Sequence, residues 1–425
     1  MSGRDHGGLH RDVACPFCGL LCDDLTIDRS GDRLALRGVA CDRARAGFER
    51  PLPAATPLID GREASLENAV AEAARLMTAS RLPLFAGLGA DVEGLRGLTA
   101  LADRCGGVLD HMHGDALFRN LTVMTERGWM VTTLSEVRNR ADLVLIVGPD
   151  PRASYPRFFE RCLGSSETLF SEHGLTRRIL RLGPATADTD GEVSLIPCDL
   201  ARLPEAIALL RALLHDPERS ISGAEGLPLG TLRELARALP EASYGVVVWA
   251  VSGFEEPWGA LAVEGLSELV RALNRTTRFS GLPLSGNDNL VGANNVATWQ
   301  SGLPLRTAFA RGRPEHDPLR FATRRLLDDG EADLLIWVSA FQPAPPPARP
   351  ASLPTIVLAT PGDARPEADL VIPVGTPGLD HAGRAFRSDS VIALPLSALR
   401  DSALPSVAEV CAALSNALEI EAAAS

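Results

Sequence analysis

Residues 141–149 read Ala-Asp-Leu-Val-Leu-Ile-Val-Gly-Pro, a run of five apolar residues that ends at a glycine and a proline. A short apolar run bounded by turn residues is typical of a strand that is buried on both faces. Besides Leu143–Val147, runs of this kind predict strands over Leu82–Ala86, Gly245–Val251, Leu334–Val338, Thr355–Leu358 and Leu370–Val374. Strands that are apolar along their whole length form parallel sheets with helices on both faces.

Segments rich in Ala, Leu and Arg lie between these runs and predict helices. We expect helices over Leu66–Thr78, Leu203–Leu214, Leu232–Leu239 and Leu261–Leu273. Ser65 precedes the first of them, and its hydroxyl can accept a hydrogen bond from an amide of the opening turn. Strands alternating with helices indicate an α/β fold of doubly wound, mostly parallel sheets. Ligands of such sheets bind at the carboxyl ends of the strands.

Two segments interrupt this alternation. Asp216–Gly230 is a polar connection with Gly and Pro, and Gln342–Pro350 reads QPAPPPARP, which predicts a loop because proline fits neither a helix interior nor a central strand. We therefore predict three consecutive parts: a cysteine-rich lobe over residues 1–55, α/β domains over residues 56–345 and a carboxy-terminal α/β segment over residues 346–425.

Composition argues against two classes of partner. The 425 residues are 45% hydrophobic, enough for a large core, and the formal net charge is −12. This charge argues against a nucleic acid or an anionic membrane surface as a partner. Met1–Arg11 is polar and lacks the apolar core of a signal peptide. Because no stretch approaches the roughly 18 apolar residues of a membrane span, we expect a cytoplasmic protein with no membrane partner.

Four of the eight cysteines lie in the first 41 residues, with the spacing C-x2-C-x3-C-x18-C. Three closely spaced thiolates can bind three irons of one cubane, and a distant fourth can close it. This predicts a [4Fe–4S] cluster held by Cys15, Cys18, Cys22 and Cys41. Zinc is the competing metal, although structural zinc sites more often use two closely spaced pairs. A remnant whose thiols hold no metal is the third alternative.

The remaining cysteines, Cys105, Cys162, Cys198 and Cys411, are scattered along the chain. We expect them to be buried as small apolar side chains.

The cysteine segment, CPFCGLLCDDL at residues 15–25, resembles the opening of the B subunit of formylmethanofuran dehydrogenase, a member of the molybdopterin oxidoreductase superfamily. Three later segments resemble the same family in the same order: TLSEVRNRADLV (133–144), GANNVATWQSGLP (292–304) and GLDHAGRAFRSD (378–389). The resemblance implies a molybdopterin-oxidoreductase-like α/β fold over nearly the whole chain, with a small cysteine-rich amino-terminal lobe.

The chain departs from this family where its catalytic members hold tungsten or molybdenum. There, a cysteine or selenocysteine follows a Gly-x-Val-Ile-Asp-type strand. Here Gly106–Asp110 matches the strand, but residues 111–120 read HMHGDALFRN, without a cysteine. Cys105 lies before the strand and cannot take that place. We expect His111 and His113 to be exposed loop side chains.

A second departure lies at residues 284–289, LSGNDN. The resemblance implies an Arg-Gly-His type sequence that faces substrate, and Ser285 and Asn287 stand in place of the Arg and the His. Loss of the cation and of the titratable imidazole removes groups needed for anion binding and proton transfer. We therefore expect no molybdenum or tungsten pterin and a lost oxidoreductase site.

This pattern resembles the B subunit of the bacterial formyltransferase/hydrolase complex. By resemblance, that complex passes a formyl group from a tetrahydromethanopterin carrier to a methanofuran-type cofactor and hydrolyses it to formate. The resemblance places hydrolysis in the A subunit and transfer in the D subunit. The chain would then have a non-catalytic, structural role, with the A, C and D subunits as partners. The alternatives are an active pterin-dependent formylmethanofuran dehydrogenase and an iron–sulfur electron-transfer module.

Overall fold

The computed structural model describes residues 8–51, 55–185, 191–254, 257–362 and 367–424. The chain forms two compact units: unit 1 comprises Met1–Gly114 with Gly286–Ser425, and unit 2 comprises Asp115–Ser285. Both boundaries expected from the sequence, at residues 55/56 and 345/346, fall inside unit 1. Residues 1–7 and 52–54, which belong to the expected amino-terminal part, lie outside the described residues. The three-part division stays a prediction.

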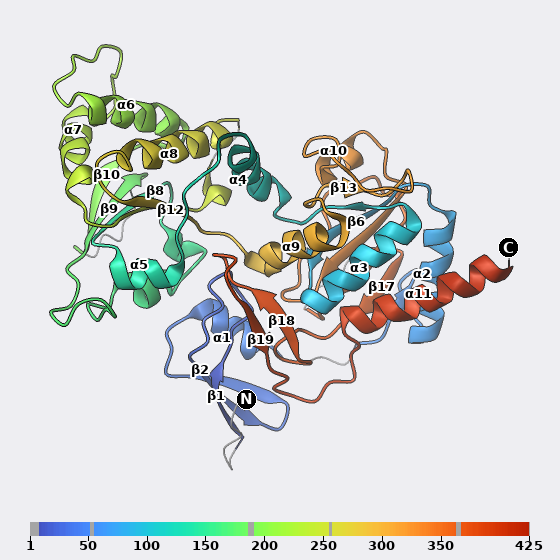
Figure 1. Ribbon diagram of the computed structural model, residues 1–425. Coiled ribbons are helices and arrows are strands. Elements are labelled where there is room, and N and C mark those ends of the chain that lie inside the picture. The colour runs from blue at the N-terminus through green and yellow to red at the C-terminus, as the bar shows by residue number, and fades with distance from the viewer. Residues whose placement is uncertain (1–7, 52–54, 186–190, 255–256, 363–366, 425) are drawn as a thin grey trace. The chain divides into compact units, whose positions relative to one another are not determined.

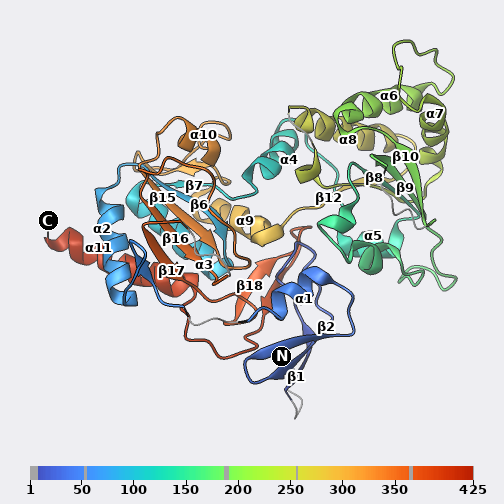
Figure 2. The ribbon, with the colours of Figure 1, turned by 180° about the vertical axis from the view of Figure 1, so that it is seen from behind.

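Unit 1 is built on a nine-stranded sheet with a parallel centre (Figures 1 and 2). The spatial order is β14-β13-β7-β6-β15-β16-β17-β4-β5. The five central strands, β7, β6, β15, β16 and β17, run parallel. Two further strands follow at each edge, and each of them is antiparallel to its neighbour on the side of the centre. The bounds are β4 Leu58–Ile59, β5 Arg62–Glu63, β6 Pro83–Gly89, β7 Val108–Leu109, β13 Thr307–Ala308, β14 Glu315–His316, β15 Leu334–Ser339, β16 Thr355–Ala359 and β17 Leu370–Pro373.

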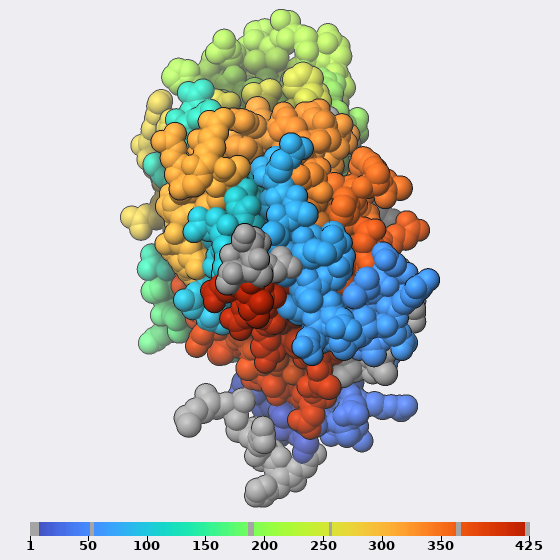
Figure 3. All heavy atoms as spheres, turned by 90° about the vertical axis from the view of Figure 1, so that its right-hand side faces the viewer, coloured from blue at the N-terminus to red at the C-terminus, as the bar shows by residue number. Residues whose placement is uncertain are grey.

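Helices cover both faces of this sheet. α11 (Val407–Ala424) packs on both α2 (Leu66–Ala79) and α3 (Val92–Cys105), and α2 contacts β17 while α3 contacts β6 (Figure 1). Figure 3 views the molecule from the side on which α2 and α11 lie. On the other face, Leu326 and Leu327 of α10 (Thr323–Asp328) share a core cluster with Trp337. The Ser65 hydroxyl accepts a hydrogen bond from the Asn68 N–H at 3.2 Å, which confirms the predicted cap.

Smaller elements complete unit 1. They are β1 Leu9–Val13, β2 Leu25–Ser30, β3 Arg33–Arg37, α1 Asp42–Phe48, α9 Leu290–Ser301, β18 Gly383–Phe386 and β19 Ala393–Leu396. β1, β2 and β3 form an antiparallel sheet, and β18 pairs with β19. Residues 342–350 form no helix or strand, as predicted from their prolines. Part of this loop lines a pocket of 490 Å³ at the ends of β16 and β17.

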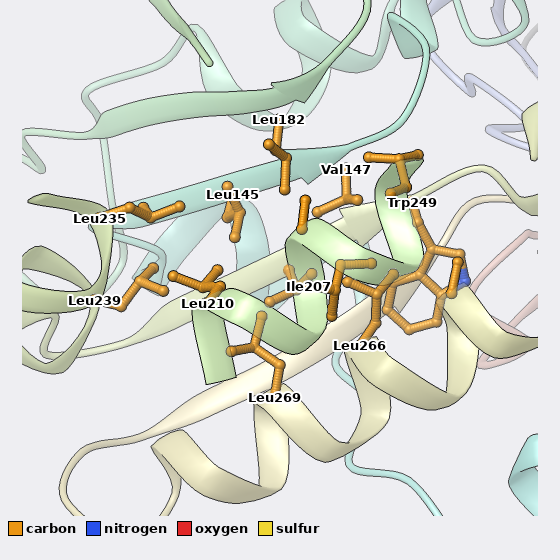
Figure 4. Packing of buried hydrophobic residues seen from close by; sticks show 14 of the residues in the cluster. Leu145, Val147, Leu182, Ile207, Leu210, Leu235, Leu239, Trp249, Leu266 and Leu269 are labelled. Carbon is orange, nitrogen blue, oxygen red and sulfur yellow. The ribbon is translucent and has the colours of Figure 1, made fainter. Parts of the chain in front are cut away.

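Unit 2 contains five parallel strands in the order β10-β9-β8-β11-β12. The strands are β8 Leu143–Val147, β9 Arg178–Gly183, β10 Val193–Pro197, β11 Gly245–Trp249 and β12 Phe279–Pro283. The helices are α4 Gly114–Arg127, α5 Leu134–Arg140, α6 Leu203–His215, α7 Leu229–Ala238 and α8 Gly259–Leu273. Figure 4 shows Leu145 and Leu182 from the sheet meeting Leu210 from α6 in the core.

All six strands and four helices expected from the sequence are present, with ends that differ by up to three residues. The prediction of an α/β fold with mostly parallel sheets is therefore confirmed. Among the described residues, no helix is both long and apolar enough to cross a bilayer.

Candidate functional site

The cysteine loop, residues 15–22, is closed by its own backbone. The Cys15 N–H donates to the Cys22 carbonyl at 2.8 Å, and the Leu21 N–H donates to the Cys18 carbonyl at 3.1 Å. Cys41, the fourth predicted ligand, directly precedes α1. Each of the four side chains is buried, with 5–7% of the residue exposed.

The four thiols lie close enough to interact electrostatically. Burial raises the pKa of the Cys15 thiol well above its usual value, and the charges of Cys18, Cys22 and Cys41 raise it further. Thiolates that repel one another in a buried space are stabilised when they bind a cationic centre. Among the described residues, no three or more His, Cys, Asp or Glu are arranged to hold one metal ion. Four buried thiols suit the four irons of a cubane in their chemistry, and the [4Fe–4S] cluster stays a prediction.

Three distant segments of unit 1 hold the cysteine loop in place. The Gln342 amide donates to the Phe17 carbonyl at 3.3 Å, and the Ser388 N–H donates to the Gly19 carbonyl at 2.8 Å. The Gly19 N–H donates to Asn287 Oδ1 at 3.1 Å. Gln342 comes shortly after β15, so the loop lies near the carboxyl edge of the parallel sheet, where ligands of such sheets bind.

The histidine loop, residues 110–114, follows β7 at the same edge and is organised by a buried ion pair. Asp110 Oδ1 lies 3.3 Å from Arg306 Nε, and it also accepts from the His111 N–H at 2.9 Å. Burial raises the pKa of the Asp110 carboxyl despite the nearby Arg306 guanidinium. A Cβ at position 114 would lie 2.2 Å from Asp110 Oδ1, so only glycine fits there.

Hydrogen bonds on both ring nitrogens fix the state of His111. Its Nδ1 accepts from the His113 N–H at 3.0 Å, so its Nε2 carries the proton and donates to the Asp288 carbonyl at 3.1 Å. Burial, together with the charge of His113, lowers the pKa of His111 from 6.5 to about 3. This imidazole therefore stays neutral at ordinary pH.

His113 and Asp288 form the polar pair of the histidine loop. His113 Nε2 lies 2.9 Å from Asp288 Oδ2, and the two side chains are 36% and 12% exposed. Burial acts to raise the pKa of Asp288, but the hydrogen bond from His113 and the charges of His113 and Arg43 outweigh it and lower the pKa. Arg43 lies two residues after Cys41, so the Asp288 carboxylate interacts electrostatically with this part of the chain as well as with the histidines.

Comparison with known proteins identifies the family. No protein-family model matches the chain. Over 339 residues the chain is 33% identical to the Fhc B subunit of the formyltransferase/hydrolase complex of Methylorubrum extorquens, covering 76% of this chain and 86% of that protein. The chain belongs to the Fhc B-subunit family.

Other relatives agree with membership of the Fhc B-subunit family. The chain is 28% identical over 403 residues to the B subunit of tungsten-containing formylmethanofuran dehydrogenase 2 of Methanocaldococcus jannaschii, covering 90% of this chain and 92% of that one. A chain of the formyltransferase/hydrolase complex FhcABCD from Methylorubrum extorquens, solved with methylofuran, matches with a TM-score of 0.75 and 31% identity. That match covers 87% of this chain and 100% of the other. The predicted resemblance to the B subunit of formylmethanofuran dehydrogenase is thereby confirmed.

The histidines of this member of the Fhc B-subunit family differ from expectation. His111 is buried with 2% exposed, so the prediction of an exposed side chain is wrong for it, and His113 is only partly exposed. The cause is long-range, because Asp288 and Arg306 bind the histidine loop, which precedes them by more than 170 residues. Asp288 was missed as a site residue, although an acidic residue between two asparagines after a glycine was a local signal for a specialised turn.

The other predicted positions divide between the units. Asn287 lies in unit 1 and binds the cysteine loop, whereas Ser285 is the last residue of unit 2. Cys162, Cys198 and Cys411 are buried as predicted, and burial raises the pKa of Cys198 to about 11 and of Cys411 to about 12. Cys105 is only partly buried, so the prediction is wrong there, because it lies in the last turn of α3.

Proposed function

We propose that the chain is a non-catalytic component of a formyltransferase/hydrolase complex and assembles with the A, C and D subunits of that complex. Support comes from its relation to the Fhc B subunit of Methylorubrum extorquens and from its match to a chain of the FhcABCD structure. The observation that carries the proposal is the state of the residues at the former oxidoreductase site. His111 has both nitrogens engaged by structural hydrogen bonds, and Asn287 binds the backbone of the cysteine loop.

The residues after β7 do not fit a pterin-bound tungsten or molybdenum. Such a metal is held by a thiolate, and residues 111–120 contain no cysteine. Met112 lies between the two histidines, and its neutral thioether is a weaker ligand than a thiolate. A Cβ on Gly89 would lie 3.3 Å from Met112 Cε, so this side chain packs against the end of β6. We therefore assign a molybdopterin-oxidoreductase-like fold that has lost its metal.

The cysteine lobe keeps a donor set suited to a cluster. A [4Fe–4S] cluster would be held by Cys15, Cys18, Cys22 and Cys41 and, when bound, would supply one-electron transfer. The chain itself buries the four sulfurs and anchors their loop through Gly19 and Phe17. Because the residues after β7 do not fit a second redox centre, we assign the lobe a structural role.

The proposal is tested by purifying the tagged chain from its native host and identifying what accompanies it. We expect the A, C and D subunits to co-purify, and we expect elemental analysis to find no stoichiometric tungsten or molybdenum. Tungsten or molybdenum at about one atom per chain would overturn the loss of the site, and recovery of the chain without other subunits would overturn the assembly. Iron with acid-labile sulfide, reduced and reoxidised during turnover, would favour the electron-transfer alternative.

A further inference from the structure

Three consecutive side chains, those of Asn287, Asp288 and Asn289, each contact a different segment of unit 1. Asn287 Oδ1 accepts from Gly19 in the cysteine loop at 3.1 Å. Asp288 binds His113 with its carboxylate and His111 with its carbonyl. Asn289 donates to the Ala90 carbonyl and accepts from the Phe386 N–H, each at 2.9 Å. We call residues 287–289 the hub.

The backbone of the hub is held in an uncommon conformation. Asp288 has φ 52° and Asn289 has φ 57°, both in the left-handed region, which is uncommon outside glycine although Asp and Asn tolerate it better than other residues do. Gly286 precedes them with φ 88°, and a Cβ there would lie 3.3 Å from the Cα atoms of both Gly19 and Ser388. Successive strained residues persist only where the surrounding contacts hold them. The contacts of Asn287 to the cysteine loop and of Asp288 to the histidine loop supply that restraint from two adjacent residues.

We propose that Asn287 and Asp288 are positioning residues that couple the cysteine loop to the histidine loop, so that loosening one loosens the other. Loss of the His113 bond to Asp288 releases the strained backbone, and the Asn287 side-chain oxygen then moves away from Gly19. Loss of the Asn287 bond frees the cysteine loop and the same backbone, and Asp288 then releases His113. Asn287 thus has a defined structural task at the position where the family resemblance implies a histidine in the catalytic relatives. This inference is independent of which metal the thiols hold.

The test measures how fast each buried thiol opens to solvent. The full chain, in its purified assembly and stripped of metal by a chelator, is alkylated with iodoacetamide, and each cysteine is followed by mass spectrometry. Asn287→Ala should speed alkylation of Cys15, Cys18 and Cys22 by about fivefold, the effect of one lost hydrogen bond on a local opening equilibrium. Asn287→Asp keeps the acceptor oxygen and should stay close to the unmodified rate.

The coupling is also tested by changing the histidine loop and measuring the cysteine loop. His113→Ala touches no cysteine, yet it should also speed alkylation of the cysteine loop, and the double variant should gain less than the product of the two single effects. In the reverse direction, Asn287→Ala should speed modification of His113 by diethyl pyrocarbonate by about fivefold, again the effect of one lost hydrogen bond. A purely local role for either residue would leave the distant loop unchanged.

Controls are built into the chain. Asn139→Ala in unit 2 removes the same kind of bond, an Oδ1 that accepts from the Leu169 N–H at 3.1 Å, and should leave both loops unchanged. Buried Cys411 in unit 1 and buried Cys198 in unit 2 should keep their rates in every variant, which shows that both units stay folded. Unchanged alkylation of the cysteine loop in Asn287→Ala, or in His113→Ala, would overturn the proposal.

Discussion

Replacing His111 by glutamine should make the chain less sensitive to acid. The imidazole is buried and neutral, and its pKa in the folded chain is about 3 against 6.5 for an unperturbed histidine. Below pH 6.5 the unfolded chain takes up a proton at this side chain and the folded chain does not. The stabilising contribution is therefore complete above pH 6.5 and is lost as the pH falls toward about 3.

The size of this loss of stability follows from the shift in the pKa of His111. Each pH unit between the two pKa values is worth about 1.4 kcal/mol of unfolding free energy. Acidification to about pH 4.5 should therefore lower the free energy of unfolding of the unmodified chain by about 3 kcal/mol through His111 alone. An amide does not titrate, so His111→Gln escapes this loss, although it should be less stable at neutral pH by about 1–3 kcal/mol because its hydrogen bonds are poorer.

Urea unfolding at several values between about pH 7 and about pH 4.5 measures the effect, because the carboxyl groups common to both proteins cancel in the difference. The difference in the free energy of unfolding between the unmodified chain and His111→Gln should become steadily smaller as the pH falls. His215→Gln removes an exposed imidazole of unit 2, and its profile should follow that of the unmodified chain. Parallel profiles for the unmodified chain and His111→Gln would refute a buried, neutral His111.

Three further changes test other parts of the molecule. Arg400→Met should lower stability by about 3–5 kcal/mol in thermal unfolding, because it removes one partner of a buried 2.6 Å ion pair with Asp380. Arg324→Met, in an exposed pair, should cost less than about 1 kcal/mol. Leu210→Ala should cost about 2–5 kcal/mol through the cavity it leaves in the core of unit 2, whereas Leu169→Ala, at a residue that is 84% exposed, should change little. Cys18→Ser should abolish iron incorporation after reconstitution with iron and sulfide, and Cys198→Ser should not; equal iron in both variants would contradict a cluster in the cysteine loop.

Local sequence predicted six of the strands and four of the helices because its signals act over a few residues. The run at Leu143–Val147 is apolar throughout and forms β8 with the same bounds. β9 was missed because Arg178 and Arg181 interrupt its apolar run, although Arg181 is buried in the structure. β12 was missed because its sequence, FSGLP, carries both a glycine and a proline.

For the site, the sequence by itself determined the family, the absence of a cysteine after β7 and the grouping of four cysteines near the amino terminus. Only the tertiary structure decided what the substituted residues do. His111 is neutral because the surrounding fold buries it and lowers its pKa, and Asn287 binds Gly19, which lies 268 residues earlier. Charge state and hydrogen bonding depend on which groups meet in space, and the loops that meet here follow β1, β7 and β12, which are far apart along the chain.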